Sequence, residues 1–282
     1  MKLLAHVSRT FHMPALSRIS RSTGPRSVSG ALFACFLSAT TLLSVPARAD
    51  EVRVLCAGAA KMALDAIGPE FTRQTGHTLR ASFDTVGAQR DRVLKGAPGT
   101  VADVVILSTA AITQLAKEGH VPGGQGVPIA IGVVSVSLAV PGGAPVPDIS
   151  TPEQLRQVLA LAPSIAYADP KRGATAGTHF DKVLRDMGLH DALRERLTVL
   201  PFGVDVIKDV SEGKYALGVS QSSEILQHAN IGMVGPLPAP YALTTPYAAA
   251  VTSAQPAAMQ LLTYLASPAG IARFRATGFL MQ

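Results

Sequence analysis

Apolar strands and amphipathic helices alternate along the first half of this chain. In residues 52–71 a short apolar run is followed by a turn of small residues and then by apolar positions at helical spacing. A second strand at 78–83 precedes a helix at 88–95. A third, at 102–107, is an almost continuous aliphatic run typical of a strand buried on both faces, and a helix at 110–118 follows it. Strand and helix repeated three times predict a doubly wound α/β lobe.

A long apolar segment at residues 127–140 divides this half of the chain from the next. Its length predicts a strand that leaves one lobe and enters another. The sequence STPE at 150–153 is a capping box with proline at the first helical position, which predicts a helix to about residue 161. Further strands are expected at 164–168, 198–202, 216–220, 232–235 and 247–252, and further helices at 179–187, 206–211, 223–228, 256–266 and 268–277.

These elements predict two α/β lobes between which the chain crosses twice. Residues 50–135 and 241–282 are expected to form the first lobe, and residues 136–240 the second. About 233 residues are enough for one large core or two moderate ones.

The first 49 residues have the pattern of an export signal. Five basic residues and no acidic residue precede an apolar run at 31–45, and Ala47-Arg48-Ala49 fits the small-x-small cleavage pattern. A membrane anchor is the alternative, but the run is shorter than the roughly 20 residues that span a bilayer. We therefore expect cleavage near Ala49, a periplasmic location and no stable membrane insertion.

Removal of this leader changes the charge of the protein. Six of the 25 basic residues and none of the 19 acidic residues fall within residues 1–49, so the remainder carries 19 of each. A formal charge of zero removes the main support for a nucleic-acid partner. Cys56 becomes the sole cysteine, so no internal disulfide can form. We expect a monomer without metal or cofactor.

The turn after the first strand is the first candidate site. Gly58, Ala59 and Ala60 form a tight, small-residue connection, and Lys61 follows it. A helix that starts here directs unpaired N–H groups and a partial positive charge above the sheet, which favours an anion. An ordinary packed turn is the alternative.

Several segments of the sequence resemble those of a known family. They are VRVLCAGAAKMALDAIGPEF, TGHTLRASFDTVGAQRDRVLKGAPGTVADVVILST, ADPKRGATAGTHFDKVLRDMGL, EGKYALGVSQSSEI and YLASPAGIARFRATGF. Together they resemble periplasmic molybdate-binding-type solute receptors, which are class II periplasmic binding proteins. The resemblance implies two lobes joined by two crossing strands, a small anion in the cleft between them, and closure about a hinge. It also implies an ABC permease as partner.

The chain departs from this family where the family binds its oxyanion. Ala59 stands where the molybdate receptors place a serine, and Val86 and Gly87 stand where they place two more. Ser220 stands where they place a tyrosine. The loss of these hydroxyl groups disfavours molybdate and tungstate, although backbone N–H groups alone could still bind an oxyanion.

Five loops are expected to converge where the strands end, as in other open α/β sheets. Their donors suit a carboxylate ligand. The candidate ligand-binding residues are Gly58, Ala59, Ala60, Lys61, Thr85, Arg90, Ser108, Thr175, Thr178, His179, Gln221 and Ser222. Structural roles remain open for several: Arg90 in a surface ion pair, Thr178 as a helix cap and His179 in a first helical turn.

Two functions from different classes remain. The first is a binding protein of an uptake system for a small anion, with an organic carboxylate preferred. The second follows from a branch of the family with similar turns, which resembles aconitate isomerase. Such a reaction needs an acid and a base near a carbon acidified by carboxylates, and His179 and Lys61 are the leading candidates. Asp84 and Glu224 are further candidates that could equally be structural.

Overall fold

A computed structural model of the protein describes residues 49–122 and 127–281. These residues belong to one compact unit, Pro46–Gln282. Apart from Ala49, the predicted leader lies outside the described residues, so the leader and its cleavage stay predictions. No helix in the described part of the chain combines the length and the apolar character needed to cross a membrane.

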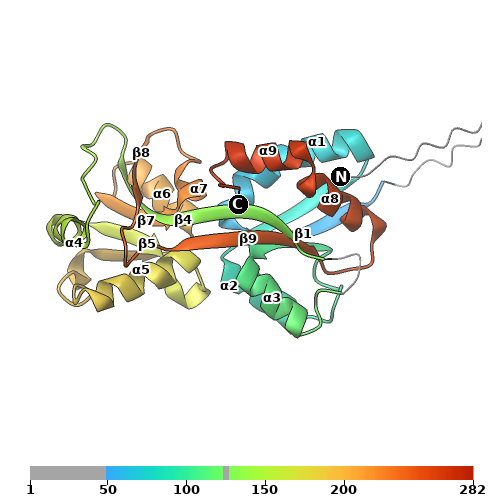
Figure 1. Cartoon of the computed structure of the whole chain (residues 1–282), viewed down its shortest axis with the longest axis horizontal. Helices are drawn as coiled ribbons and strands as arrows, with labels where there is room; N and C mark the ends of the chain where they lie inside the picture. The colour runs from blue at the N-terminus through green and yellow to red at the C-terminus, as the bar shows by residue number, and fades with distance from the viewer. Residues whose placement is uncertain (1–48, 123–126, 282) are drawn as a thin grey trace, which may run out of the picture. The chain divides into compact units, whose positions relative to one another are not determined.

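The described residues form strands, α-helices and three short 3-10 helices (Figure 1). The strands are β1 (Glu51–Ala57), β2 (Thr78–Asp84), β3 (Val104–Ser108), β4 (Ile129–Pro141), β5 (Ile165–Ala168), β6 (Leu197–Leu200), β7 (Leu217–Gln221), β8 (Ile231–Pro236) and β9 (Thr244–Val251). The α-helices are α1 (Lys61–Thr75), α2 (Val86–Lys95), α3 (Thr109–Lys117), α4 (Pro152–Leu161), α5 (Thr175–Asp186), α6 (Gly203–Ser211), α7 (Ser222–Ile225), α8 (Pro256–Ala266) and α9 (Pro268–Ala276). The 3-10 helices are η1 (Gly58–Ala60), η2 (Pro170–Arg172) and η3 (Arg194–Arg196).

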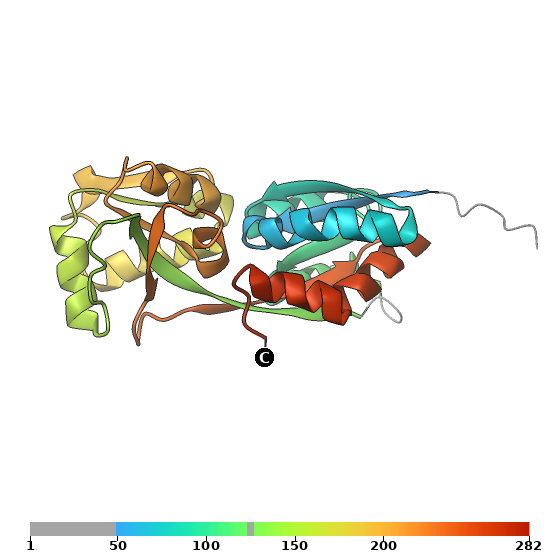
Figure 2. The same ribbon diagram turned by 90° about the horizontal axis from the view of Figure 1, so that it is seen from above.

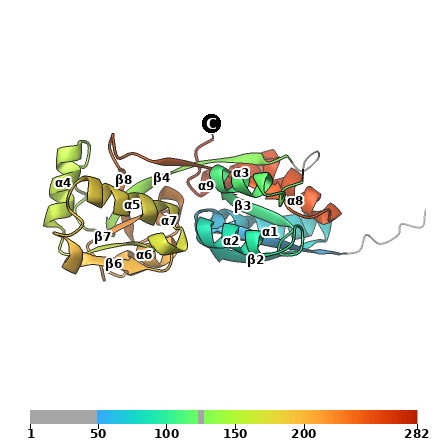
Figure 3. The same ribbon diagram turned by 90° about the horizontal axis from the view of Figure 1, so that it is seen from below.

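Strands β4 and β9 connect two groups of parallel strands. The sheet has the order β2-β1-β3-β9-β4-β7-β5-β6, and β8 pairs with β4. The first part of β4, Ile129 to Ser135, pairs antiparallel with β9, whereas the part from Val136 onward pairs with β7 and β8. Figures 2 and 3 show β4 and β9 running from one group of helices to the other. One long strand therefore belongs to both lobes.

The hydrophobic core is divided in the same way. One cluster of buried side chains draws on residues 52–134 and 247–279, and it defines lobe 1. Two further clusters draw only on residues 136–237, and they define lobe 2. The change of cluster falls within β4, between Val134 and Val136. Lobe 1 is thus built from two separate stretches of chain, and lobe 2 is continuous.

Several helices begin earlier than their apolar periodicity predicts. The start of α5 is Thr175 rather than residue 179, and α2 and α6 begin at Val86 and Gly203 rather than at residues 88 and 206. The first turns of these helices hold small residues that look like loop in the sequence. In α5, a Cβ on Gly177 would lie 1.8 Å from the carbonyl oxygen of Ala168. Such glycines allow a first turn to pack directly on backbone.

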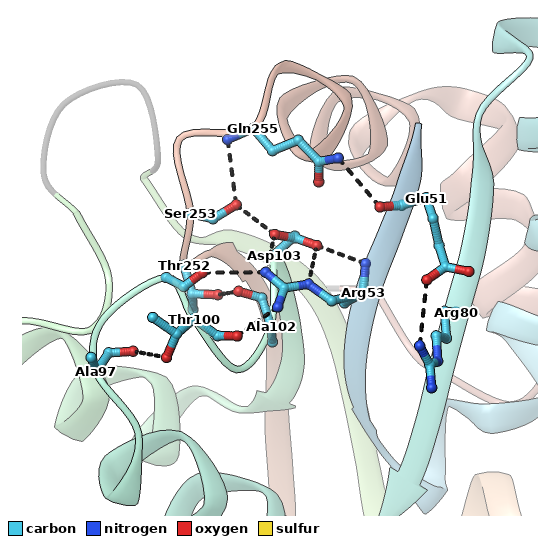
Figure 4. A network of polar contacts seen from close by, with 11 residues as sticks. Glu51, Arg53, Arg80, Ala97, Thr100, Ala102, Asp103, Thr252, Ser253 and Gln255 are labelled. Atoms are coloured by element: carbon cyan, nitrogen blue, oxygen red, sulfur yellow. Dashed lines mark hydrogen bonds and ion pairs between the residues drawn. The ribbon is translucent and has the colours of Figure 1, made fainter. Parts of the chain in front are cut away.

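A polar network fixes the end of lobe 1 where β1 begins (Figure 4). Asp103 accepts hydrogen bonds from the Arg53 backbone N–H at 2.8 Å, from the Arg53 guanidinium at 2.8 and 2.9 Å, and from Ser253 Oγ at 2.8 Å. Burial raises the pKa of Asp103, but the hydrogen bonds from Arg53 and Ser253 and the Arg53 charge outweigh it and hold the pKa below its usual range. The ionised pair ties β1, the start of β3 and the segment after β9 together.

Candidate functional site

A cavity of about 130 Å³ lies between the two lobes, where the parallel strands end. A single ordered water needs about 10–15 Å³ by the same kind of measure, so a small molecule fits. The cavity is lined by Ala57, Gly58, Ala59, Lys61, Phe83, Asp84, Thr85, Val86 and Tyr247 of lobe 1, and by Ala168, Ala174, Thr175, Ala176, Phe202, Gly203, Val204, Gln221 and Glu224 of lobe 2.

Helix starts from both lobes converge on this cavity. Lobe 1 contributes η1 with the following α1, and also α2, while lobe 2 contributes α5, α6 and the short α7. Within the described chain, η1, α5 and α6 have no side-chain cap, because Ala57, Ala174 and Phe202 occupy their N-cap positions. Away from the cavity, α4 and α9 are capped by Thr151 and Ser267, whereas α8 also lacks a side-chain cap. The uncapped starts leave backbone N–H groups for a ligand.

Lys61 adds a full positive charge to this wall. Its ammonium group pairs with Asp65 one turn along α1 and lies 4.7 Å from the centre of the Phe83 ring. About 38% of the side chain is exposed, so the ammonium can reorient at little cost. Together with the partial charges of the helix starts, it makes the cavity favourable for an anion.

The two lobes are in contact at the mouth of the cavity. The Gly87 N–H donates to the carbonyl oxygen of Gly173 at 3.1 Å, and Thr85 Oγ1 donates to the carbonyl oxygen of Arg172. The Arg172 guanidinium donates to both carboxylate oxygens of Asp84, at 2.8 and 3.0 Å, and stacks 4.8 Å from the Phe202 ring centre. Backbone and side-chain contacts thus connect the two lobes beside the cavity.

Two buried titratable side chains lie at the floor of the cavity. Burial raises the pKa of Glu224, an effect that hydrogen bonds from Ser220 and the Gln221 N–H partly oppose. Burial also raises the pKa of the Tyr247 phenol, and the nearby Glu224 carboxyl raises it further. Tyr247 is therefore a neutral hydroxyl that can donate a hydrogen bond.

Half of the sequence-predicted site residues line the cavity. These are Gly58, Ala59, Lys61, Thr85, Thr175 and Gln221. Thr85 also caps α2, accepting a hydrogen bond from the Ala88 N–H at 3.2 Å. Their roles toward a ligand remain predictions.

The structure does not bring the other six to the cavity wall. They are Ala60, Arg90, Ser108, Thr178, His179 and Ser222. Ala60 is buried, Thr178 is exposed, and Ser108 caps α3 through the Ala111 N–H. Ser222 accepts a hydrogen bond from the Ser135 N–H at 3.2 Å.

Arg90 and His179 have structural partners instead. The Arg90 guanidinium binds the neighbouring Asp91 carboxylate at 2.6 and 2.8 Å. His179 Nε2 lies 2.7 Å from the carbonyl oxygen of Tyr241. Because α5 begins at Thr175, His179 falls at its fifth residue, beyond the helix start that faces the cavity.

Phe83, Phe202, Gly203 and Tyr247 line the cavity but were not predicted from the sequence. Gly203 has a local signal, since it lies between a strand and an apolar helical pattern. The aromatic residues have none, because strand periodicity does not distinguish a core residue from a cavity wall. For Glu224, the sequence QSSE at 221–224 has capping-box spacing, and its carboxylate accepts from the Gln221 N–H at 3.3 Å.

Metal binding has no support in the described residues, where no group of three or more His, Cys, Asp or Glu side chains is gathered at one place. Cys56 is fully buried in β1, and burial raises the pKa of its thiol, which disfavours a nucleophilic role.

Comparisons with known proteins identify the family of this chain. A family profile described as bacterial extracellular solute-binding protein matches residues 52–280. The chain is 30% identical to an aconitate isomerase from Pseudomonas sp. over 252 residues, covering 86% of this chain and 92% of the relative. It is 25% identical to the molybdate-binding protein ModA of Azotobacter vinelandii, covering 86% and 94%.

Solved structures give the same picture of the fold. The periplasmic molybdate-binding protein of Azotobacter vinelandii superposes with a TM-score of 0.64 at 22% identity, over 82% of this chain and 99% of that one. At this identity the similarity concerns the fold.

Proposed function

Because this chain belongs to the bacterial extracellular solute-binding proteins, we propose that its interlobe cavity captures a small organic carboxylate. The observation that carries the proposal is the convergence of uncapped helix starts from both lobes on one cavity. Their N–H groups bind carboxylate oxygens, and Lys61 supplies charge.

The walls favour a ligand with a carbon skeleton over a tetrahedral oxyanion. Ala59 and Val86, which stand where the resembling molybdate receptors place serines, line the cavity with apolar surface. Phe83, Phe202 and Val204 extend that surface. Apolar walls with a few polar groups are typical of sites for organic ligands. In this role the protein, exported to the periplasm, delivers its ligand to an ABC permease.

A second candidate function is isomerisation of aconitate. It is favoured by the 30% identity to an aconitate isomerase across most of both chains. The titratable side chains that line the cavity, Lys61, Asp84, Glu224 and Tyr247, are the candidates for acid and base in that reaction. His179 is not among them.

A thermal-shift panel tests the first proposal. The purified protein is heated with molybdate, tungstate, sulfate, citrate, cis-aconitate, trans-aconitate or tricarballylate. A ligand at about 100 times its Kd stabilises by roughly 2.7 kcal/mol, which moves the Tm of a protein of this size by a few degrees. Shifts with carboxylates alone support the proposal, and a shift with molybdate alone contradicts it.

Proton NMR in D₂O separates the two functions. Aconitate incubated with an isomerase interconverts between its cis and trans forms, whereas a receptor returns it unchanged. Interconversion that tracks protein concentration would establish the enzyme, and binding without interconversion would leave the receptor.

A further inference from the structure

Glu224 occupies an unusual position for a carboxyl group. It is 7% exposed and lies on α7 at the cavity floor. Within the described chain, both hydrogen bonds to its carboxyl group end on Oε2, from Ser220 Oγ and from the Gln221 N–H at 3.3 Å. Oε1 faces Gly58, where an added Cβ would lie 2.7 Å from it. An added Cβ on Gly203 would lie 2.2 Å from Oε2. Two glycines at helix starts thus make room for this group.

The carboxyl conflicts with the rest of the cavity if it is ionised. The helix starts and Lys61 favour an anion, and a ligand carboxylate would have to share a buried site with the Glu224 charge. Two carboxylates held close together in a site of low dielectric do not both ionise, and one of them keeps a proton. A protonated Glu224 would remove the repulsion and add a hydrogen-bond donor.

No cation neutralises Glu224 in the described structure. Ser220, on β7, offers a neutral hydroxyl. The titratable groups on the surrounding elements are Cys56 on β1, Lys61 on α1, Tyr247 on β9, Asp84 with Arg172 where the lobes meet, and Asp205, Lys208 and Asp209 on α6. Lys61 pairs with Asp65, and Arg172 pairs with Asp84. Burial keeps the Cys56 thiol and the Tyr247 phenol neutral at physiological pH. Glu224 therefore has hydroxyl and amide partners but no ion-pair partner.

We propose that Glu224 binds the ligand as a neutral carboxylic acid whose O–H donates a hydrogen bond to a ligand carboxylate, so that capture of the ligand is coupled to proton uptake by this side chain. The inference rests on the proposed carboxylate ligand. It means that affinity falls as the pH rises, by up to about tenfold per pH unit where the ligand-free Glu224 is ionised. The protein then captures ligand best in an acidified medium.

Calorimetric titration with tricarballylate tests the coupling. Heats measured at one pH in buffers of different ionisation enthalpy give the number of protons taken up on binding. Glu224→Gln keeps the shape and a donor but cannot ionise. We expect its proton uptake to be lower than that of the wild type and its affinity to vary less with pH. Asp205→Asn removes another partly buried carboxyl with a raised pKa, on α6 outside the cavity lining, and should behave as the wild type.

A second variant keeps the test decisive if Glu224→Gln fails to fold. Ser220→Ala retains the carboxyl but removes a hydrogen bond that lowers the pKa of Glu224, so the fall in affinity should begin at a higher pH. Equal proton uptake in the wild type and Glu224→Gln overturns this inference but not the proposed function. An unchanged dependence of affinity on pH in Ser220→Ala has the same consequence. Failure of the wild type to bind any carboxylate of the panel overturns the proposed function and this inference with it.

Discussion

Gly87 and Gly173 bring the backbones of the two lobes into direct contact at the mouth of the cavity. The Gly87 N–H donates to the Gly173 carbonyl oxygen at 3.1 Å, and a Cβ on either glycine would lie 2.7 Å from the Cα of the other. Gly173 also has a φ of +70°, which favours glycine. Closure of the cavity thus depends on the absence of two side chains.

Replacement of Gly87 should therefore weaken ligand capture. Gly87→Ala places a methyl group against the backbone of the other lobe, so full closure is blocked. We expect the Kd for tricarballylate, measured by calorimetry, to rise about tenfold, which corresponds to about 1.4 kcal/mol. Gly68→Ala in helix α1 is the matched control, because its Cβ would meet only the Leu79 side chain of β2, at 3.8 Å. If Gly87→Ala and Gly68→Ala bind tricarballylate with the same affinity, the contact between Gly87 and Gly173 is not needed for closure of the cavity.

Lys61 should contribute to affinity through its charge. Lys61→Gln keeps the length of the side chain and removes the ammonium, so we expect the Kd for carboxylates to rise on the order of tenfold, as for loss of a charge-assisted hydrogen bond. Lys182→Gln is the control, since Lys182 makes a similar i,i+4 pair with Asp186 outside the cavity lining. A Lys61→Gln variant with wild-type affinity would remove Lys61 from the ligand shell.

His179 should be dispensable for both binding and turnover. Its imidazole is hydrogen-bonded to the Tyr241 carbonyl and does not line the cavity. His179→Ala should leave the carboxylate Kd unchanged and lower the free energy of unfolding by about 1 kcal/mol, the usual value of one hydrogen bond. Calorimetry and urea denaturation measure the two effects. Loss of aconitate turnover with intact binding would restore the catalytic role expected from the sequence.

The Asp103–Arg53 network should make stability depend on pH. The pKa of Asp103 is lowered in the folded state, so its stabilisation is present above the unfolded value of about 3.9 and is lost as the pH falls through the folded pKa. Asp103→Asn should lower the free energy of unfolding by about 1–3 kcal/mol at neutral pH, and by less in acid. Urea denaturation at both pH values measures this difference.

A surface pair provides the comparison for Asp103. Asp91→Asn removes a pair with Arg90, and both of its members are about one-third exposed or more. We expect it to change the free energy of unfolding by under about 1 kcal/mol at either pH. If Asp103→Asn lowers the free energy of unfolding at neutral pH by as little as Asp91→Asn does, the structural role of the network is contradicted.

The family and the two-lobe fold were predictable from the sequence, and both predictions are confirmed. Buried strands such as β3 and the capping box of α4 are local signals that depend on few distant contacts. The starts of α2, α5 and α6 were predicted too late. Their first turns pack glycine on distant backbone or beside Glu224, which periodicity along the chain does not record.

The candidate site was predictable only in part, for a related reason. Gly58 and Gln221 lie at the carboxyl ends of β1 and β7, and Lys61 begins the helix that follows β1, where the fold itself brings residues together. His179 and Thr178 were predicted on the assumption that α5 begins at residue 179, so a boundary error of four residues moved the expected site along the helix. Tyr247 lies in a strand that crosses between the lobes, and its exposure to the cavity depends on how the lobes meet.

The position of β9 has a consequence for synthesis of the chain. This strand lies between β3 and β4 in the sheet, and residues 247–279 complete the core of lobe 1. Lobe 2 is continuous in sequence and precedes them. As the polypeptide emerges, lobe 2 can acquire its whole core while β3 still has an unpaired edge. Lobe 1, whose first stretch is synthesised before lobe 2, is thus completed after it. Until β9 pairs with β3, the edge of β3 is open to association with other chains.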